Sequence, residues 1–162
     1  MSRIQAFRES LLEMCRETYG EHLVSVAIFG SWARGTATPE SDIDLLVIAE
    51  ELPPSRGKRL DQFERIETAT EQIRRQIWGA SPAASSLSPV IKTTEEFKAG
   101  SPLYLDMTEW CEMLFDRDAF LASALALLRK RMKELGTRRC SAKGGYYWEY
   151  KPDLKPGEVV EL

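Results

Sequence analysis

Apolar residues near the N-terminus recur every three or four positions, the spacing of one face of a helix, and Ser2 with Gln5 has the spacing of a capping box. We therefore expect a helix that ends near Gly20. Two short β-branched and apolar runs follow, Leu23 to Phe29 and Ile43 to Ile48. Such runs are typical of buried strands. The pattern thus predicts a helix followed by two strands.

The next elements are separated by turn-forming residues. Prolines and a glycine within residues 53–57 indicate a loop, and apolar residues at helical spacing among many charges predict an amphipathic helix from Arg59 to Trp78. A third strand is expected at Leu87 to Lys92. Thr93 and Glu96 have the spacing of another capping box, so a short helix should follow this strand.

The C-terminal third shows a less regular pattern. Two further helices are expected at about residues 103–115 and 118–135, the second ending at Gly136. The remainder is expected to be irregular, apart from a final strand at Val159 to Leu162. The sequence contains no internal repeat.

The segment between the first two predicted strands carries the most informative chemistry. A buried strand leads to Gly30 and Ser31, where the missing Cβ of Gly30 allows a ligand to approach the backbone closely. If a short helix begins at Ser31, its free amide groups form a phosphate site to which Arg34 adds a positive charge. The Gly-Lys-Ser or Gly-Lys-Thr ending of a Walker A loop does not occur here, so this is a different kind of phosphate site.

Asp42 and Asp44 lie at the edge of the second predicted strand. Their spacing places both carboxylates on the same face of the strand, while Ile43 points to the opposite face and the core. Two adjacent carboxylates repel each other, and a divalent cation relieves that repulsion. Mg²⁺ typically takes one or two protein carboxylates together with phosphate oxygens and water. The segment therefore predicts a magnesium–nucleotide site, in which the metal would neutralise charge developing at phosphorus.

Each part of this segment has an ordinary structural explanation when taken alone. A Gly-Ser pair after a strand is usually a turn, and an Asp-x-Asp pair is often a solvated strand end or a helix cap. The order of strand, Gly-Ser, Arg-Gly and Asp-x-Asp within an apolar strand is far more specific. We therefore interpret the combination as functional.

This order resembles the signature of the DNA polymerase beta-like nucleotidyltransferase superfamily, and in particular its small stand-alone members, the minimal nucleotidyltransferases. In that signature Gly-Ser precedes Ala-Arg-Gly and then Ser-Asp-x-Asp, which apolar residues follow. The resemblance covers roughly residues 1–100. The matching residues are Gly30, Ser31, Ala33, Arg34, Gly35, Ser41, Asp42, Asp44 and Leu45 to Val47.

The resemblance implies an α+β fold in which helices pack against a mixed β-sheet. Residues 1–100 would form the nucleotidyltransferase core. Residues 101–162 would add C-terminal helices and a basic, aromatic tail packed on the same single domain.

The resemblance also implies the reaction and its ligands. Members of the family transfer a nucleoside monophosphate from an NTP to a hydroxyl and release pyrophosphate. Here Mg²⁺ would be held by the catalytic pair Asp42 and Asp44, and the NTP, expected to be ATP, would be bound by Gly30, Ser31, Arg34 and Ser41.

The sequence departs from the family pattern at one position. The superfamily's third carboxylate, which helps activate the attacking hydroxyl, should lie on the strand at Leu87 to Lys92, where the sequence has Ser86 and Ser88. The two glutamates that follow lie beyond this strand, and Asp106 falls in a predicted helix. We expect Ser88 at the third position. Either another group then serves as the base, or the partner or substrate supplies one, or the protein binds nucleotide with weak turnover.

Composition narrows the class of protein. Of 162 residues, 43% are hydrophobic and 29% are charged, a balance that excludes disordered, collagen-like and membrane-spanning classes. The length suits one domain. The net charge of −3 argues against a protein that coats nucleic acid, because such binding depends on bulk positive charge.

The three cysteines, Cys15, Cys111 and Cys140, and the single histidine, His22, do not have a zinc-binding spacing, so reduced structural thiols are expected. No signal-peptide pattern follows Met1, and no apolar run approaches the roughly 20 residues needed to span a bilayer. We therefore expect a cytoplasmic protein without membrane contacts.

Residues 129–155 carry nine basic and three acidic residues, a local charge of +6 that leaves −9 for the rest of the chain. Four aromatic residues between Tyr146 and Tyr150 accompany them. Such a mixture can bind nucleic acid, a phosphate-rich ligand or an acidic partner. We favour a solvated helix face with an aromatic tail folded onto the core, and we expect Trp32 to pack rather than to stack on a base.

The leading hypothesis is a Mg-dependent enzyme that transfers a nucleotidyl group to an acceptor hydroxyl. Because the chain is too short for a separate acceptor domain, the acceptor is expected on another polypeptide. Minimal nucleotidyltransferases of this kind pair with small helical HEPN proteins as antitoxins, and this family analogy suggests such a partner. The alternative is a catalytically weak nucleotide-binding module that masks a partner protein. An RNA- or antibiotic-modifying transferase is a third hypothesis.

Overall fold

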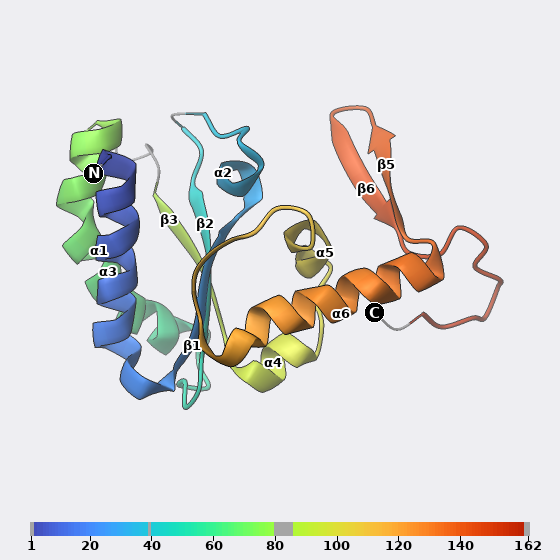
Figure 1. The fold of residues 1–162 in the computed structure, drawn as a ribbon, viewed down its shortest axis with the longest axis horizontal. Coiled ribbons are helices and arrows are strands. Elements are labelled where there is room, and N and C mark those ends of the chain that lie inside the picture. Colours follow the sequence, from blue (N-terminus) through green and yellow to red (C-terminus); the bar gives the residue numbers. More distant parts are fainter. Residues whose placement is uncertain (1, 39, 80–85, 161–162) are drawn as a thin grey trace.

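The computed structural model describes residues 2–38, 40–79 and 86–160 (Figure 1). Helices cover both faces of one four-stranded sheet, and a separate two-stranded hairpin lies near the C-terminal end of the last helix (Figure 1). The elements are, in order, α1 (Arg3–Tyr19), a 3₁₀ turn (Gly20–His22), β1 (Leu23–Phe29), α2 (Gly30–Arg34), β2 (Ile43–Ala49), α3 (Arg56–Trp78), β3 (Leu87–Lys92), α4 (Thr94–Lys98), α5 (Leu103–Met107), β4 (Glu112–Asp116), a second 3₁₀ turn (Arg117–Ala119), α6 (Phe120–Leu135), β5 (Arg138–Ala142) and β6 (Gly145–Glu149).

The four-stranded sheet has the order β3-β2-β1-β4 and is mixed. β1 is antiparallel to both β2 and β4, whereas β3 runs parallel to β2 after the crossover through α3. This is the α+β architecture with a mixed sheet that the sequence predicts. The register pairs Phe29 with Asp44, so the end of β1 and the start of β2 lie side by side.

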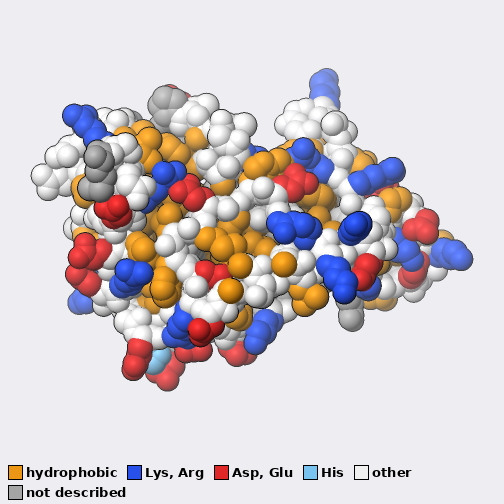
Figure 2. Space-filling view, in the orientation of Figure 1, with side chains coloured by type: hydrophobic (Ala, Val, Ile, Leu, Met, Phe, Trp, Pro, Cys, Tyr) orange, Lys and Arg blue, Asp and Glu red, His pale blue; other side chains and the backbone are white. Residues whose placement is uncertain are grey.

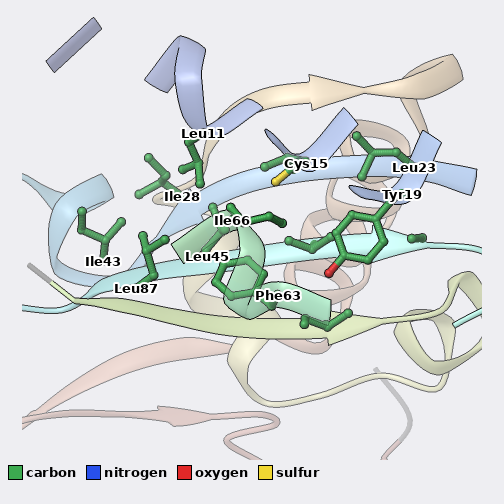
Figure 3. Packing of buried hydrophobic residues seen from close by; sticks show 14 of the residues in the cluster. Leu11, Cys15, Tyr19, Leu23, Ile28, Ile43, Leu45, Phe63, Ile66 and Leu87 are labelled. Carbon is green, nitrogen blue, oxygen red and sulfur yellow. The ribbon is translucent and has the colours of Figure 1, made fainter. Parts of the chain in front are cut away.

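Side chains of the central strands alternate between two apolar layers because successive residues of a strand point to opposite faces. Ile43, Leu45 and Val47 of β2 face α1 and α3, where Phe63 fills the centre of the layer (Figure 3). The other layer packs α4, α5 and α6 against the second face of the sheet. Its buried members are Val24, Ala27, Phe29, Leu46, Ile48, Phe97, Tyr104, Met107, Leu121 and Leu125.

A buried arginine fastens α3 to the neighbouring elements. The Arg59 guanidinium donates to both oxygens of the Glu96 carboxylate at 2.6 and 2.9 Å, to the Pro53 carbonyl at 2.6 Å and to the Ile91 carbonyl at 3.2 Å. Glu96 also accepts from the Thr93 amide at 2.9 Å and so completes the predicted capping box of α4. One residue thus links α3, β3 and α4 at the outer edge of the sheet.

The predicted helix at 103–115 is wrong in its second half. The helix ends at Met107, and Glu112–Asp116 form the edge strand β4 beside β1. Asp116 fixes the end of β4 to its neighbours. Its carboxylate accepts hydrogen bonds from the Ser25 hydroxyl of β1 at 2.7 Å and from the amides of Leu121 and Ala122 of α6 at 2.9 Å each. Pairing with the open edge of β1 outweighs the helical preference of a short apolar run.

The expectation of an irregular chain after Gly136 is also wrong. Residues 138–142 and 145–149 pair as the antiparallel hairpin β5–β6, joined by Lys143 and Gly144. Gly144 has a φ of +88°, which such tight turns need and which glycine adopts without strain. A final strand is not formed at residues 159 and 160, and residues 161 and 162 lie outside the described part.

The remaining expected elements are confirmed, with α3 beginning three residues earlier and α6 two residues later than predicted. The division of the chain at residue 100 stays a prediction, and the sheet takes its fourth strand from residues beyond that point.

Within the described ranges, helices long and apolar enough to cross a membrane do not occur. The three cysteines are free thiols, and burial raises the pKa of Cys15 to about 12.

Candidate functional site

The turn after β1 is built around Gly30 and the carboxylate of Asp44. Gly30 has a φ of +69°, and a Cβ added to it would lie 2.1 Å from Oδ2 of Asp44. The sequence predicts that this open space admits a ligand, yet the carboxylate from the neighbouring strand occupies it. Glycine is therefore required here twice, for the backbone conformation and for the close approach of Asp44.

Ser31, Arg34 and Trp32 lie on the short helix α2, which Gly35 ends in the left-handed conformation at φ +73°. The condition set for a phosphate site at this turn, a short helix that includes Ser31, is thus met. Trp32 packs edge-on against Trp78 of α3 with ring centroids 5.2 Å apart, so the packing role expected for it is confirmed. Its indole nitrogen donates to the Ser41 carbonyl at 3.3 Å and ties α2 to the loop before β2.

The side chain of Ser41 stabilises that loop. Its hydroxyl oxygen accepts from the Thr38 amide at 2.9 Å, and its amide donates to the Thr38 carbonyl at 3.0 Å. The loop in turn delivers Asp42 to the start of β2. A direct role of Ser41 in nucleotide binding stays a prediction.

Asp42 directly precedes β2 and is exposed, whereas Asp44 lies in the strand and is half-buried. The Ser86 hydroxyl donates to Oδ1 of Asp42, and Ser88 is the register partner of Asp44 on the parallel strand β3. Directly paired residues of neighbouring strands share a face. The structure thus brings Ser88 next to Asp44, where the sequence analysis expects the third position.

The electrostatics of this pair favour a bound cation. Burial raises the pKa of Asp44, the neighbouring charge of Asp42 raises it further, and Arg34 partly offsets both effects. A cation between two such carboxylates removes the repulsion and stabilises their charged forms. Two carboxylates also match the protein share of a typical Mg²⁺ site, in which phosphate oxygens and water complete the shell. The residues present therefore fit a magnesium–nucleotide complex.

This geometry agrees with comparisons against known proteins. A family model described as "Nucleotidyltransferase domain" matches residues 8–99, more than half of the chain, and includes most of α1, the Gly30 turn and the Asp42–Asp44 pair. The chain belongs to the nucleotidyltransferase domain family. It is therefore a nucleotidyltransferase, and the predicted family and reaction class are confirmed.

One relative of this nucleotidyltransferase is a protein of Methanocaldococcus jannaschii named "Putative protein adenylyltransferase", which is 30% identical over 130 residues. The aligned region covers 78% of this chain and 82% of the relative. Two solved structures share the fold at 15% sequence identity. Each alignment covers 80% of this chain and 92% of the chain in the solved structure. They are a toxin–antitoxin with AMP-PNP, at a TM-score of 0.50, and a mutant of the toxin–antitoxin MntA-HpeT, at 0.51.

Contacts between this nucleotidyltransferase's signature and its C-terminal hairpin are not predicted by the sequence. Arg34 donates to the Tyr146 hydroxyl at 2.9 Å and lies 3.8 Å from the Asp106 carboxylate. The signal that could have revealed the hairpin is Lys143-Gly144 between two stretches rich in arginine and aromatic residues, a two-residue loop of the hairpin type. Its docking on Arg34 has no local signal, because the two segments are more than 100 residues apart.

Proposed function

We propose that this nucleotidyltransferase binds an NTP, with ATP as the favoured nucleotide, together with Mg²⁺ at Asp42 and Asp44, and transfers the nucleoside monophosphate to a hydroxyl of another protein. The observation that carries the proposal is the Gly30 turn, which brings the Asp44 carboxylate against the backbone that leads into Ser31. A metal-binding carboxylate and a candidate phosphate site thus lie side by side.

The comparisons support a protein acceptor. The relative from M. jannaschii is named as a protein adenylyltransferase, and the two structures that share the fold come from toxin–antitoxin systems. We infer that the partner of this chain is a small helical protein of the HEPN type and that the chain acts on it as an antitoxin.

The reaction forms a bond between the acceptor oxygen and the α-phosphorus and breaks the bond between that phosphorus and the bridging oxygen to the β-phosphate. Pyrophosphate leaves, and the acceptor hydroxyl loses its proton to a base. Mg²⁺, when bound, neutralises charge on the phosphate oxygens. Asp42 and Asp44 hold the cation, the amide and hydroxyl of Ser31 anchor phosphate oxygens, and Arg34 contributes a fixed positive charge.

The acceptor's proton requires a base that β3 does not provide, because Ser88 occupies the position beside Asp44. A serine hydroxyl orients a water or an acceptor by hydrogen bonding, but it is not basic at neutral pH. We therefore infer that the partner or the nucleotide complex supplies the base. The deprotonation step then depends on the docking of the partner.

The test is a transfer assay with candidate HEPN-type partner proteins, Mg²⁺, and ATP labelled at either the α- or the γ-phosphate. We expect the partner to acquire label from α-labelled ATP alone. The Asp42→Asn/Asp44→Asn double variant should lose at least about 99% of the rate, in line with the loss of metal-dependent charge stabilisation. Equal labelling by the wild type and the double variant would refute the proposal.

The serine at position 88 favours a second candidate function, a nucleotide-binding module that masks its partner without turnover. Calorimetric measurement of partner binding to this chain, together with the label-transfer assay, distinguishes the two functions. Masking predicts tight partner binding by the Asp42→Asn/Asp44→Asn variant and no label transfer by the wild type. Transfer further predicts that Ser88→Asp, which adds a carboxylate beside Asp44, raises the rate by about tenfold or more, a fraction of the usual effect of a general base.

A further inference from the structure

The inner face of the β5–β6 hairpin lies against Arg34 of α2, within the nucleotidyltransferase signature. In Figure 1, α2 and the hairpin lie toward the top of the view, and α5 lies below and between them. The hairpin register pairs Arg139 with Trp148 and Cys140 with Tyr147. Because paired residues share a face and neighbours alternate, Tyr146 and Trp148 lie on one face of the hairpin and Tyr147 on the other.

The inner face makes a closed set of polar contacts with Arg34 of α2 and Asp106 of α5. Nη1 of Arg34 donates to the Tyr146 hydroxyl at 2.9 Å and lies 3.8 Å from Oδ2 of Asp106. The indole of Trp148 donates to Oδ1 of the same carboxylate at 2.7 Å. Arg34 is thus held by two groups that come from outside the family match at residues 8–99.

Tyr146 is itself fixed from its other side. The Arg139 guanidinium lies between two rings, 4.5 Å from the centroid of Trp110 and 5.0 Å from that of Tyr146. Nη1 of Arg139 lies 3.3 Å from Oε2 of Glu109. Cation–π contacts of this kind orient the rings as well as the guanidinium. The Tyr146 hydroxyl therefore has a defined position relative to Arg34.

This arrangement prepares Arg34 for an anionic ligand. Arg34 lies at the C-terminal end of α2, four residues after Gly30, and an added Cβ on Gly30 would meet the Asp44 carboxylate. A guanidinium has five N–H donors, and the hydrogen bond to Tyr146 uses one of them. A side chain fixed in the folded state loses less entropy when it binds phosphate oxygens than a free arginine would.

We propose that the β5–β6 hairpin is part of the nucleotide site and that Tyr146 and Asp106 are positioning residues, which hold Arg34 in place for the triphosphate of the bound NTP. The inference rests on the proposed function and assigns a role to the C-terminal tail. Burial and the neighbouring Asp106 raise the pKa of Tyr146, so its hydroxyl stays neutral and accepts the hydrogen bond from Arg34 at physiological pH. In this interpretation, the basic, aromatic tail supports the nucleotide site of its own chain by positioning Arg34.

The test measures binding of Mg²⁺ and an ATP analogue with a methylene group between the α- and β-phosphorus atoms, by calorimetry on the full chain. Tyr146→Phe removes one oxygen from a partly exposed residue, and Asp106→Asn removes the charge. We expect each variant to bind the analogue about fivefold more weakly. That is the effect of losing one charge-assisted interaction that orients Arg34 without touching the ligand. Tyr147→Phe, on the outer face and 56% exposed, is the matched control and should bind as the wild type does.

The decisive comparison is made in an Arg34→Ala background. If Tyr146 acts through Arg34, Tyr146→Phe causes no further loss there, whereas a purely structural role would weaken binding by the same factor in both backgrounds. Unchanged binding by both Tyr146→Phe and Asp106→Asn, or an additive effect of Tyr146→Phe in the Arg34→Ala background, would overturn the inference and leave the proposed function intact. A wild-type chain that does not bind the analogue would overturn both.

Discussion

At the scale of single residues, the site depends on a glycine that directly follows β1 and a carboxylate on the neighbouring strand β2. Gly30 provides a positive φ that turns the chain from β1 into α2, and its missing side chain makes room for Asp44. The sequence identifies both residues as important. It does not show that one fills the space left by the other, because that contact depends on the antiparallel register between β1 and β2.

Gly30→Ala should therefore affect binding more than stability. The new Cβ would lie 2.1 Å from Oδ2 and 3.0 Å from Cγ of Asp44, so the carboxylate must move. We expect affinity for the magnesium–nucleotide complex to fall at least about tenfold, together with a strain cost of about 1 kcal/mol from the positive φ.

Gly20→Ala is the matched control, because Gly20 also has a positive φ but no atom of the described residues lies within 4 Å of the place that an added Cβ would take. Thermal unfolding should show a similar loss of stability in both variants, and calorimetry should show a loss of binding in Gly30→Ala alone. Wild-type affinity in Gly30→Ala would show that the position of Asp44 is unimportant for binding.

At the scale of elements, the outer edge of the sheet is held by the ion pair between Arg59 of α3 and Glu96 of α4. The Arg59 side chain is 9% exposed and that of Glu96 is 41% exposed. The hydrogen bonds from Arg59, followed by that from the Thr93 backbone, lower the pKa of Glu96 to about 2. The pair fixes β3, the strand that carries Ser88, against α3.

This ion pair predicts a defined pH dependence of stability. Because the folded-state pKa of Glu96 lies below its ordinary value of 4.5, the stabilisation is fully present above about pH 4.5 and is lost as the pH falls toward 2. Solvent screening at the half-exposed carboxylate limits the contribution to about 1 kcal/mol. Chemical denaturation at several pH values measures it.

Glu96→Gln should lower stability at pH 7 and flatten the pH dependence between about 4.5 and 2. Glu64→Gln, an exposed position on α3, should leave both unchanged. If Glu96→Gln has the same pH profile as the wild type, the Arg59–Glu96 pair does not contribute to stability.

Elements with local signals are those that the sequence predicts correctly. The capping box at Thr93 and the β-branched runs of β1 and β2 fix their elements almost to the residue. β4 is different, because residues 112–116 become a strand through pairing with β1 and through the contacts of Asp116 with α6. The signature predicts that Gly30, Asp42 and Asp44 belong to one site, whereas the contact of Asp44 with Gly30 depends on the strand register and the docking of Tyr146 on Arg34 depends on tertiary packing.

At the scale of the whole molecule, local ion pairs partly neutralise the excess of basic residues in the C-terminal part of the chain. Lys and Arg side chains gather over α6 and the hairpin, on the right of the view in Figure 2. Many of these cations have acidic neighbours. The ion pairs of this region are Arg131–Glu134, Arg138–Glu149, Arg139–Glu109 and Lys151–Glu158.

Because four of the nine basic residues at 129–155 form local ion pairs, the tail should bind RNA weakly. We expect fluorescence anisotropy with a single-stranded RNA oligonucleotide to give a dissociation constant of about 100 µM or weaker near 0.15 M salt, the weak end of non-specific binding. Binding at low micromolar concentration that weakens steeply with salt would contradict this prediction and favour an RNA-modifying transferase.

The most direct test of the central claim is a crystal structure of the chain grown with Mg²⁺ and the methylene-bridged ATP analogue. We predict a cation between the carboxylates of Asp42 and Asp44, with the triphosphate at Ser31 and Arg34. A nucleotide bound elsewhere, such as in the cavity of about 830 Å³ beside α4, α5 and α6, or a triphosphate far from Asp42 and Asp44, would contradict the account.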